Sequence, residues 1–182
     1  MTTKGFTIIE TLIAVAILMI AIVGPLTIAN RGLIAAVTAR EQITANYLAQ
    51  DAMEYIKNIR DGSLIEGDID EGALYWTADF NENGVECSET TNKRCTVDTI
   101  TGAQTECSSS TTCGQLYFDS EQRFTHVNTG NPTLYKRFYT VVMKETATGI
   151  QDEARVQVTV VWKSGKITNT TSIKSNLYNV YR

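Results

Sequence analysis

The feature that most constrains this chain is an apolar stretch at its amino terminus, residues 6–29. No charged residue occurs from Thr11 to Ala29, and Glu10 is the only charge within the stretch. A helix needs about 20 mostly apolar residues to cross the hydrocarbon core of a bilayer, so one transmembrane span is predicted. A carboxylate inside a bilayer costs roughly 2.5–3.5 kcal/mol and is normally paired. Because the stretch has no Lys, Arg or His, Glu10 either reaches an interface or meets a positive charge from another molecule.

The leader, residues 1–5, differs from a secretory signal. Such a signal places small residues and a cleavage site after its apolar region, whereas here Gly5 precedes the apolar region. Cleavage after Gly5 would leave the hydrophobic helix on the mature protein. The alternative from physics alone is an uncleaved signal anchor that holds Glu10 near the lipid headgroups.

Residues 5–14, GFTIIETLIA, resemble the processing motif of type IV prepilins and of the related pseudopilins of type II secretion. This resemblance implies that a prepilin peptidase cuts between Gly5 and Phe6 and methylates the new amino group of Phe6. It also implies that Glu10 pairs with the terminal amine of a neighbouring subunit, which would supply the missing positive charge.

The same resemblance implies partners and a location. The partners would be other pilin or pseudopilin subunits, the prepilin peptidase, an inner-membrane assembly platform and, before assembly, membrane lipid. The chain would first cross the cell membrane once with its head exported. It would then enter a pilus at the cell surface or, in the alternative, a periplasmic pseudopilus.

Charge argues against nucleic acid as the favoured partner. The 182 residues include 16 Lys and Arg against 20 Asp and Glu, for a net charge of −4. Without a basic cluster there is no electrostatic footprint for phosphate binding, although net charge alone does not exclude a small pilin-like DNA receptor. The length suits a single exported domain.

The apolar helix is predicted to bend or melt at Gly24 and Pro25, because an interior proline removes a backbone hydrogen bond. A helix breaker in this region also resembles many filament-forming pilins. The helix is expected to continue as an amphipathic segment over residues 31–60 and to stop at Asp61-Gly62. Its covered face is predicted from residues at helical spacing: Leu33, Val37, Thr44, Leu48, Ala52, Tyr55 and Ile59.

The rest of the chain, residues 61–182, is expected to form a globular head that ends in strands. Runs at 134–144, 154–163 and 166–174 are rich in β-branched and aromatic residues and are separated by turn residues. They predict an antiparallel meander over residues 134–176. A long helix, transmembrane in its first half and amphipathic in its second, would pack on this sheet in an α+β, pilin-like fold.

Four cysteines, Cys87, Cys95, Cys107 and Cys113, lie in an insertion predicted at residues 84–114. An even, clustered set favours two disulfides in an exported domain. Of the three connectivities, we favour Cys87 with Cys95 and Cys107 with Cys113, which closes two small loops. The alternative is a zinc site, but there is no Cys-x-x-Cys pair and the one histidine is distant in sequence.

A second candidate metal site is the segment DFNENG, residues 79–84. Asp79, Asn81 and Asn83 match the alternating oxygen ligands of the first half of a calcium loop. The second half does not match, because Thr90 stands where a bidentate acid belongs. The alternative is a loop that uses Asp, Asn and Gly for turn formation alone. No other cofactor is expected.

No catalytic motif occurs in the sequence, and with one histidine for acid-base chemistry an enzyme is not expected. The sequence predicts a structural subunit of a type IV filament, with a minor pilin that initiates or tips a pilus for adhesion, motility or DNA uptake as the favoured role. A minor pseudopilin of type II secretion is the first alternative. A membrane-anchored enzyme or binding protein with an uncleaved signal anchor is the second.

Overall fold

The structure is a computed structural model, and it describes residues 5, 7–66, 87, 93–107, 113–145 and 151–178. The chain divides into two compact units, residues 1–41 and residues 42–182. The first unit contains the start of a single long helix, and the second contains the end of that helix and a sheet.

Helix α1, Ile8–Glu66, is the only long helix in the described residues. It combines the predicted transmembrane and amphipathic segments in one element. The predicted stop at Asp61-Gly62 falls within the last turns of α1, which ends at Glu66. A glycine inside a helix costs only about 1 kcal/mol relative to alanine, so Gly62 weakens the last turns without ending them.

Within the described ranges, the sheet has seven strands and every pair of neighbouring strands is antiparallel. Its strands are β1 (Cys95–Val97), β2 (Gln104–Glu106), β3 (Gln115–Phe118), β4 (Phe124–Thr125), β5 (Pro132–Glu145), β6 (Gln151–Ser164) and β7 (Ile167–Tyr178). Strand β5 is central, since it pairs with β6 and also with β1 and β3. Strands β2 and β4 extend the sheet beyond β1 and β3.

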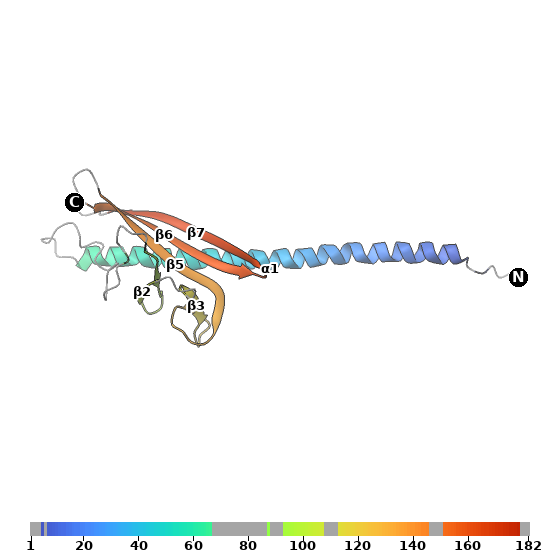
Figure 1. Ribbon diagram of the computed structural model, residues 1–182, viewed down its shortest axis with the longest axis horizontal. Helices are drawn as coiled ribbons and strands as arrows, with labels where there is room; N and C mark the ends of the chain where they lie inside the picture. The colour runs from blue at the N-terminus through green and yellow to red at the C-terminus, as the bar shows by residue number, and fades with distance from the viewer. Residues whose placement is uncertain are drawn as a thin grey trace. The chain divides into compact units, whose positions relative to one another are not determined.

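Strands β5, β6 and β7 form the predicted meander, which confirms the α+β architecture of a long helix packed against a carboxyl-terminal antiparallel sheet. Each strand is longer than the run that predicted it. Figure 1 shows the three strands lying along the carboxyl-terminal part of α1, with the short strands β2 and β3 on the other side of β5. The alternation in β6 is as expected, because Val156, Val158 and Val160 are fully buried.

The core of the second unit lies between α1 and the inner face of the sheet. The helix contributes small and medium side chains at intervals of three and four residues: Ala45, Leu48, Ala49, Ala52, Met53 and Ile56. Burying one side chain such as Ile56 contributes roughly 1.5–3 kcal/mol. Leu48 and Ala52 of the predicted face are buried, whereas Leu33 and Val37 are exposed. The predicted face is therefore correct only in its carboxyl-terminal part.

Candidate functional site

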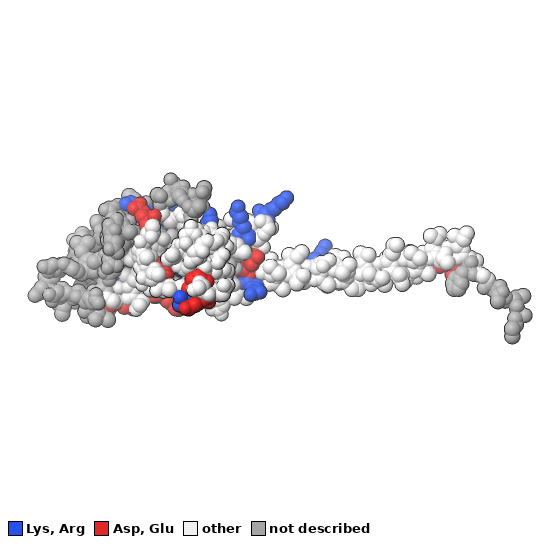
Figure 2. Space-filling model, turned by 90° about the horizontal axis from the view of Figure 1, so that it is seen from below, with Lys and Arg blue, Asp and Glu red and all other residues white. Residues whose placement is uncertain are grey.

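The first part of α1 presents apolar side chains to its surroundings in every direction. Figure 2 shows this part of the helix almost without charged side chains on the visible face. The helix is long and apolar enough to cross a membrane, and its most apolar window has no buried residue. Such a surface needs lipid or other helices around it. The exposed large apolar residues of this segment are Ile8, Ile9, Leu12, Ile13, Val15, Ile17, Leu18, Met19, Ile20, Ile22, Val23, Leu26, Ile28, Leu33, Ile34 and Val37.

Glu10 lies in the first turn of α1, with its side chain exposed. The backbone N–H groups of Glu10 and Thr11 donate to the Thr7 carbonyl at 3.1 and 3.3 Å, which closes the turn. A carboxylate is favourable at this end of a helix because the unpaired N–H groups carry partial positive charge. In the part of the chain that the structure describes, no cation pairs with Glu10.

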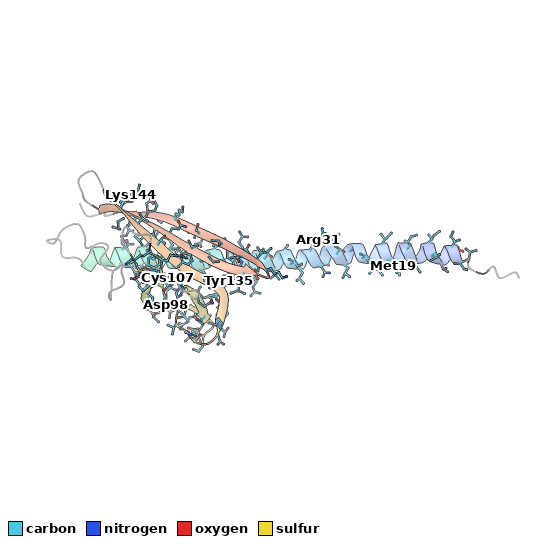
Figure 3. The ribbon with its side chains drawn as sticks, viewed as in Figure 1. Met19, Arg31, Asp98, Cys107, Tyr135 and Lys144 are labelled. Carbon is cyan, nitrogen blue, oxygen red and sulfur yellow. A yellow bond between two sulfur atoms is a disulfide. The ribbon has the colours of Figure 1, made fainter. Side chains whose placement is uncertain are left out.

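Arg31 is the next charged residue along α1 after Glu10. Its side chain is exposed and projects from the helix in Figure 3. Among the described residues, no carboxylate pairs with Arg31. Between Ile8 and Ala39, α1 therefore exposes one acid and one base that are separated by an uncharged apolar run.

Three threonine hydroxyls in the first unit are satisfied by the helix itself. Thr11 donates to the Ile8 carbonyl at 2.8 Å, and Thr27 donates to the Val23 carbonyl at 2.8 Å. Thr38 donates to a carbonyl one turn earlier in the same way. Because an unpaired hydroxyl in an apolar medium costs several kcal/mol, these bonds allow the threonines to face lipid or other helices.

The predicted local melting at Gly24 and Pro25 is wrong, since α1 runs through both residues without interruption. Proline cannot donate to the carbonyl four residues earlier, that of Ala21, but the bonds on either side persist. The Thr27 hydroxyl adds a bond to Val23 within the same turn and supports the helix there.

The structure joins Cys87 to Cys95 and Cys107 to Cys113, the connectivity favoured from the sequence. Cys87 and Cys95 are both buried in the core, and they attach the chain before β1 to the sheet. Cys107 and Cys113 lie nearer the surface, at the end of β2 and just before β3. The residue after Cys113 is Gly114, whose φ is +76°. A side chain is disfavoured there, because a Cβ would lie 2.7 Å from the backbone oxygen of Arg137.

Several predicted site residues lie outside the described residues. They include Phe6, the residue that would be methylated, while Gly5 is described and exposed. The calcium candidates Asp79, Asn81 and Asn83 also lie outside. Within the described ranges, no group of three or more potential metal-ligating side chains comes together. The calcium site stays a prediction.

The sequence did not indicate an ion pair that a buried arginine forms with an acid on α1, within a set of contacts that joins three elements of the second unit. The guanidinium of Arg137 on β5, which is 1 % exposed, donates to the Asp51 carboxylate at 2.7 Å. It also donates to the carbonyls of Leu48 on α1 and Val97 on β1, each at 3.1 Å. Burial lowers the pKa of Arg137, and its hydrogen bond to the Asp51 carboxylate opposes that change. Strand alternation could have found this residue, because Tyr135, Arg137 and Tyr139 share the inward face.

Asp98 organises the turn between β1 and β2. Its carboxylate accepts bonds from the backbone N–H groups of Ile100 and Thr101, and from the Thr125 hydroxyl and the His126 N–H. Burial alone would raise the pKa of Asp98, but these bonds together lower it to about 2. The carboxylate therefore stays ionised and fixes the turn against β4.

His126 is the one histidine of the chain. Its Nδ1 lies 3.2 Å from the Gln115 carbonyl, which fixes the proton on Nδ1. Burial, with the positive charge of Arg137 as a second cause, lowers the pKa of His126 to about 4. The imidazole is therefore neutral at pH 7, and it packs inside the head with a hydrogen bond to the Gln115 carbonyl.

Residues 1–24 match a family model described as the prokaryotic N-terminal methylation motif. Together with the long apolar helix, this match is consistent with a type IV pilin-like protein. No curated protein and no solved structure matches the chain. The family match covers the leader and the start of α1, and the head has no counterpart in these comparisons.

Proposed function

We propose that this chain is a structural subunit of a type IV filament, stored in a membrane through α1 and then packed into a fibre. The observation that carries the proposal is the methylation motif directly followed by an exposed apolar helix with one unpaired carboxylate. Neighbouring helices would cover the apolar surface in the fibre, and lipid would cover it before assembly. The prepilin peptidase and other filament subunits are the partners that such a motif implies.

The role of Glu10 in this proposal is to set the axial position of a subunit. A processed Phe6 would carry a protonated amine, and the Glu10 carboxylate of an adjacent subunit would bind it. The charge-assisted bond would be strong in an apolar surrounding, because neither group has water available.

Within this class we propose a minor pilin that initiates or tips a pilus. The support is the head: strands β1 to β4 and two disulfides form an elaboration beside the meander that suits display at the end of a fibre. A minor pseudopilin is the second candidate, because the same motif and helix would serve a periplasmic pseudopilus.

Mass spectrometry on sheared surface filaments and on the remaining cell envelope tests these proposals. We expect a peptide that begins at Phe6 with a methylated amino group. Trace amounts in sheared fibres would support a minor pilin, and abundance there would indicate the main subunit. Processed protein confined to the envelope would support the pseudopilus. An intact Met1 or Thr2 terminus in cells with an active prepilin peptidase would overturn the filament role.

A Glu10→Ala variant tests the assembly role separately from membrane insertion. We expect the variant to fractionate with membranes as the wild type does, because the apolar length is unchanged, and to be at least about tenfold depleted from fibres. Thr11→Ala is the matched control, since it removes a neighbouring hydroxyl and no charge. Normal incorporation of Glu10→Ala would contradict the assigned role.

A further inference from the structure

Two charges stand alone on the apolar part of α1. Between Ile8 and Ala39 the only charged side chains are Glu10 and Arg31, and both are exposed. Neither has an ionic partner in the described part of the chain. In a bilayer Arg31 could reach the headgroups, but in the core of a fibre an unpaired guanidinium would be costly.

Helix geometry prevents these two charges from pairing within one chain. Arg31 follows Glu10 by 21 positions on an uninterrupted helix. At about 1.5 Å per residue, the two positions are about 32 Å apart along the axis. At 3.6 residues per turn they lie only about 60° apart around it, so both project toward the same side of the helix.

We propose that Arg31 of one subunit binds the Glu10 carboxylate of a second copy of this chain, packed in parallel and displaced by about 32 Å along the helix axis. The inference rests on the proposed filament function. It adds a second axial contact to the one between Glu10 and the amine of Phe6. A carboxylate has two oxygens and about four acceptor positions, so Glu10 can accept from the amine of one neighbour and the guanidinium of another.

Charge complementarity indicates that the helix packed against this face of α1 is a second copy of the same chain. The surface between the two charges is uncharged over its whole length, and an equally apolar parallel helix is the surface it fits. At a displacement of 21 residues, the single acid of one copy faces the single base of the next. Every other displacement that keeps Arg31 against the run between the two charges leaves it opposite an uncharged side chain.

The same contact predicts an open assembly. Each copy would use Glu10 toward one neighbour and Arg31 toward another, which makes the contact heterologous. Each step climbs about 32 Å, so a ring cannot close, and copies that are brought next to each other would stack in an open helical array. Because the two charges lie on one side of the helix, the two neighbours also lie close together and the array winds tightly.

Cysteine crosslinking measures the displacement directly. Ile17 and Thr38 each follow one of the charges by seven positions, about two turns, and should face each other across the same contact. We expect a chain with Ile17→Cys and Thr38→Cys, overproduced so that copies become neighbours, to form a covalent ladder on oxidation of sheared fibres. The native cysteines do not interfere, because all four are in disulfides.

The matched control is a chain with Ile17→Cys and Ile28→Cys. These positions are 11 residues apart and lie on nearly the same side of the helix, but at the wrong displacement. Equal ladders from both pairs, or fibres that contain the Ile17/Thr38 variant without crosslinks, would overturn the inference and leave the filament function intact. Absence of the processed chain from every fibre would overturn both.

Substitution of Arg31 tests the charge itself. In the Ile17/Thr38 background, Arg31→Gln should lower the crosslinked fraction roughly tenfold, as expected for one lost charge-assisted hydrogen bond, and Arg31→Lys should restore most of it. If Arg31 only stabilised its own helix, Arg31→Lys would not restore the crosslinks, and the crosslinked fraction would not differ between the Ile17/Thr38 and Ile17/Ile28 cysteine pairs. If Arg31 binds only lipid phosphate, Arg31→Gln will leave the crosslinks unchanged, which also overturns the inference.

Discussion

At the scale of single residues, the head depends on a cation that water does not reach. Arg137 is buried and donates to Asp51, whose own side chain is about half exposed. Removal of the acid would leave the guanidinium in the core without its counter-charge. The more exposed partner therefore has a larger effect on stability than its exposure suggests.

We expect Asp51→Ala to lower the free energy of unfolding of the head by about 3 kcal/mol. Denaturant unfolding followed by near-UV circular dichroism measures this change. The matched control is Asp61→Ala on the same helix, because Asp61 pairs with Arg60, whose side chain is 17 % exposed and therefore keeps some contact with water. We expect this change to cost less than about 1 kcal/mol. Equal effects of the two variants would show that Arg137 does not need its carboxylate.

His126 gives the head a pH dependence in the neutral to mildly acidic range. Its pKa is about 4 in the folded chain and near 6.5 when unfolded, so between these values only the unfolded chain binds the proton. Stability is therefore highest above pH 6.5 and falls as the pH decreases toward 4. We expect a loss of about 2 kcal/mol between pH 7 and pH 5 in the wild type, and a nearly flat profile in His126→Asn. A wild-type profile as flat as that of the variant would contradict the buried neutral state.

At the scale of elements, the two disulfides have different surroundings and should differ in their contribution. Both close short loops, for which chain entropy predicts roughly 2–3 kcal/mol. The Cys87–Cys95 bond also fills the core, because both residues are at most 1 % exposed. We expect the double change Cys87→Ser and Cys95→Ser to cost at least about 1 kcal/mol more than Cys107→Ser and Cys113→Ser. Thermal unfolding without reductant compares the two variants, and equal melting temperatures would oppose the distinction.

The long elements could be predicted from the sequence because a single period repeats along each of them. The apolar run predicted the start of α1, and alternation of Val156, Val158 and Val160 predicted a buried face of β6. Strands β1 to β4 have only two to four residues, too few for alternation to be read. The sequence left both a bend and local melting open at Pro25, and α1 does not melt there because one lost hydrogen bond is small against the bonds that surround it.

The candidate site was only partly predictable. The predicted processing and assembly residues, Gly5, Phe6 and Glu10, come from a local motif, and their roles stay predictions. The contacts of Arg137 could not, because they join residues 40 to 89 positions apart, and only the fold brings these together. The proposed contact of Arg31 could not be predicted either, because the distance between Arg31 and Glu10 is defined only if α1 is unbroken between them.

At the scale of the whole molecule, the chain consists of a unit with its own core and a unit without one. Of the residues that the structure describes, all the buried core residues lie in the second unit, residues 42–182, whereas the large apolar side chains of the first unit are exposed. A chain that begins at Gln42 should therefore fold in water when its disulfides can form. We expect it to be monomeric by analytical ultracentrifugation and to keep the near-UV spectrum of the detergent-solubilised full chain. Aggregation, or loss of that spectrum, would show that the first unit is required for folding.

The exposed apolar surface of α1 has a thermodynamic consequence for a subunit that leaves a bilayer. Lipid tails and neighbouring helices are about equally apolar, so the transfer between them gains little from the hydrophobic effect. For the proposed filament subunit, the equilibrium between the lipid-stored and the assembled state would then be close to balance, and the few polar contacts along the helix would decide its direction. A fibre built in this way can be lengthened or dissolved with little work per subunit, because no large free-energy drop has to be reversed.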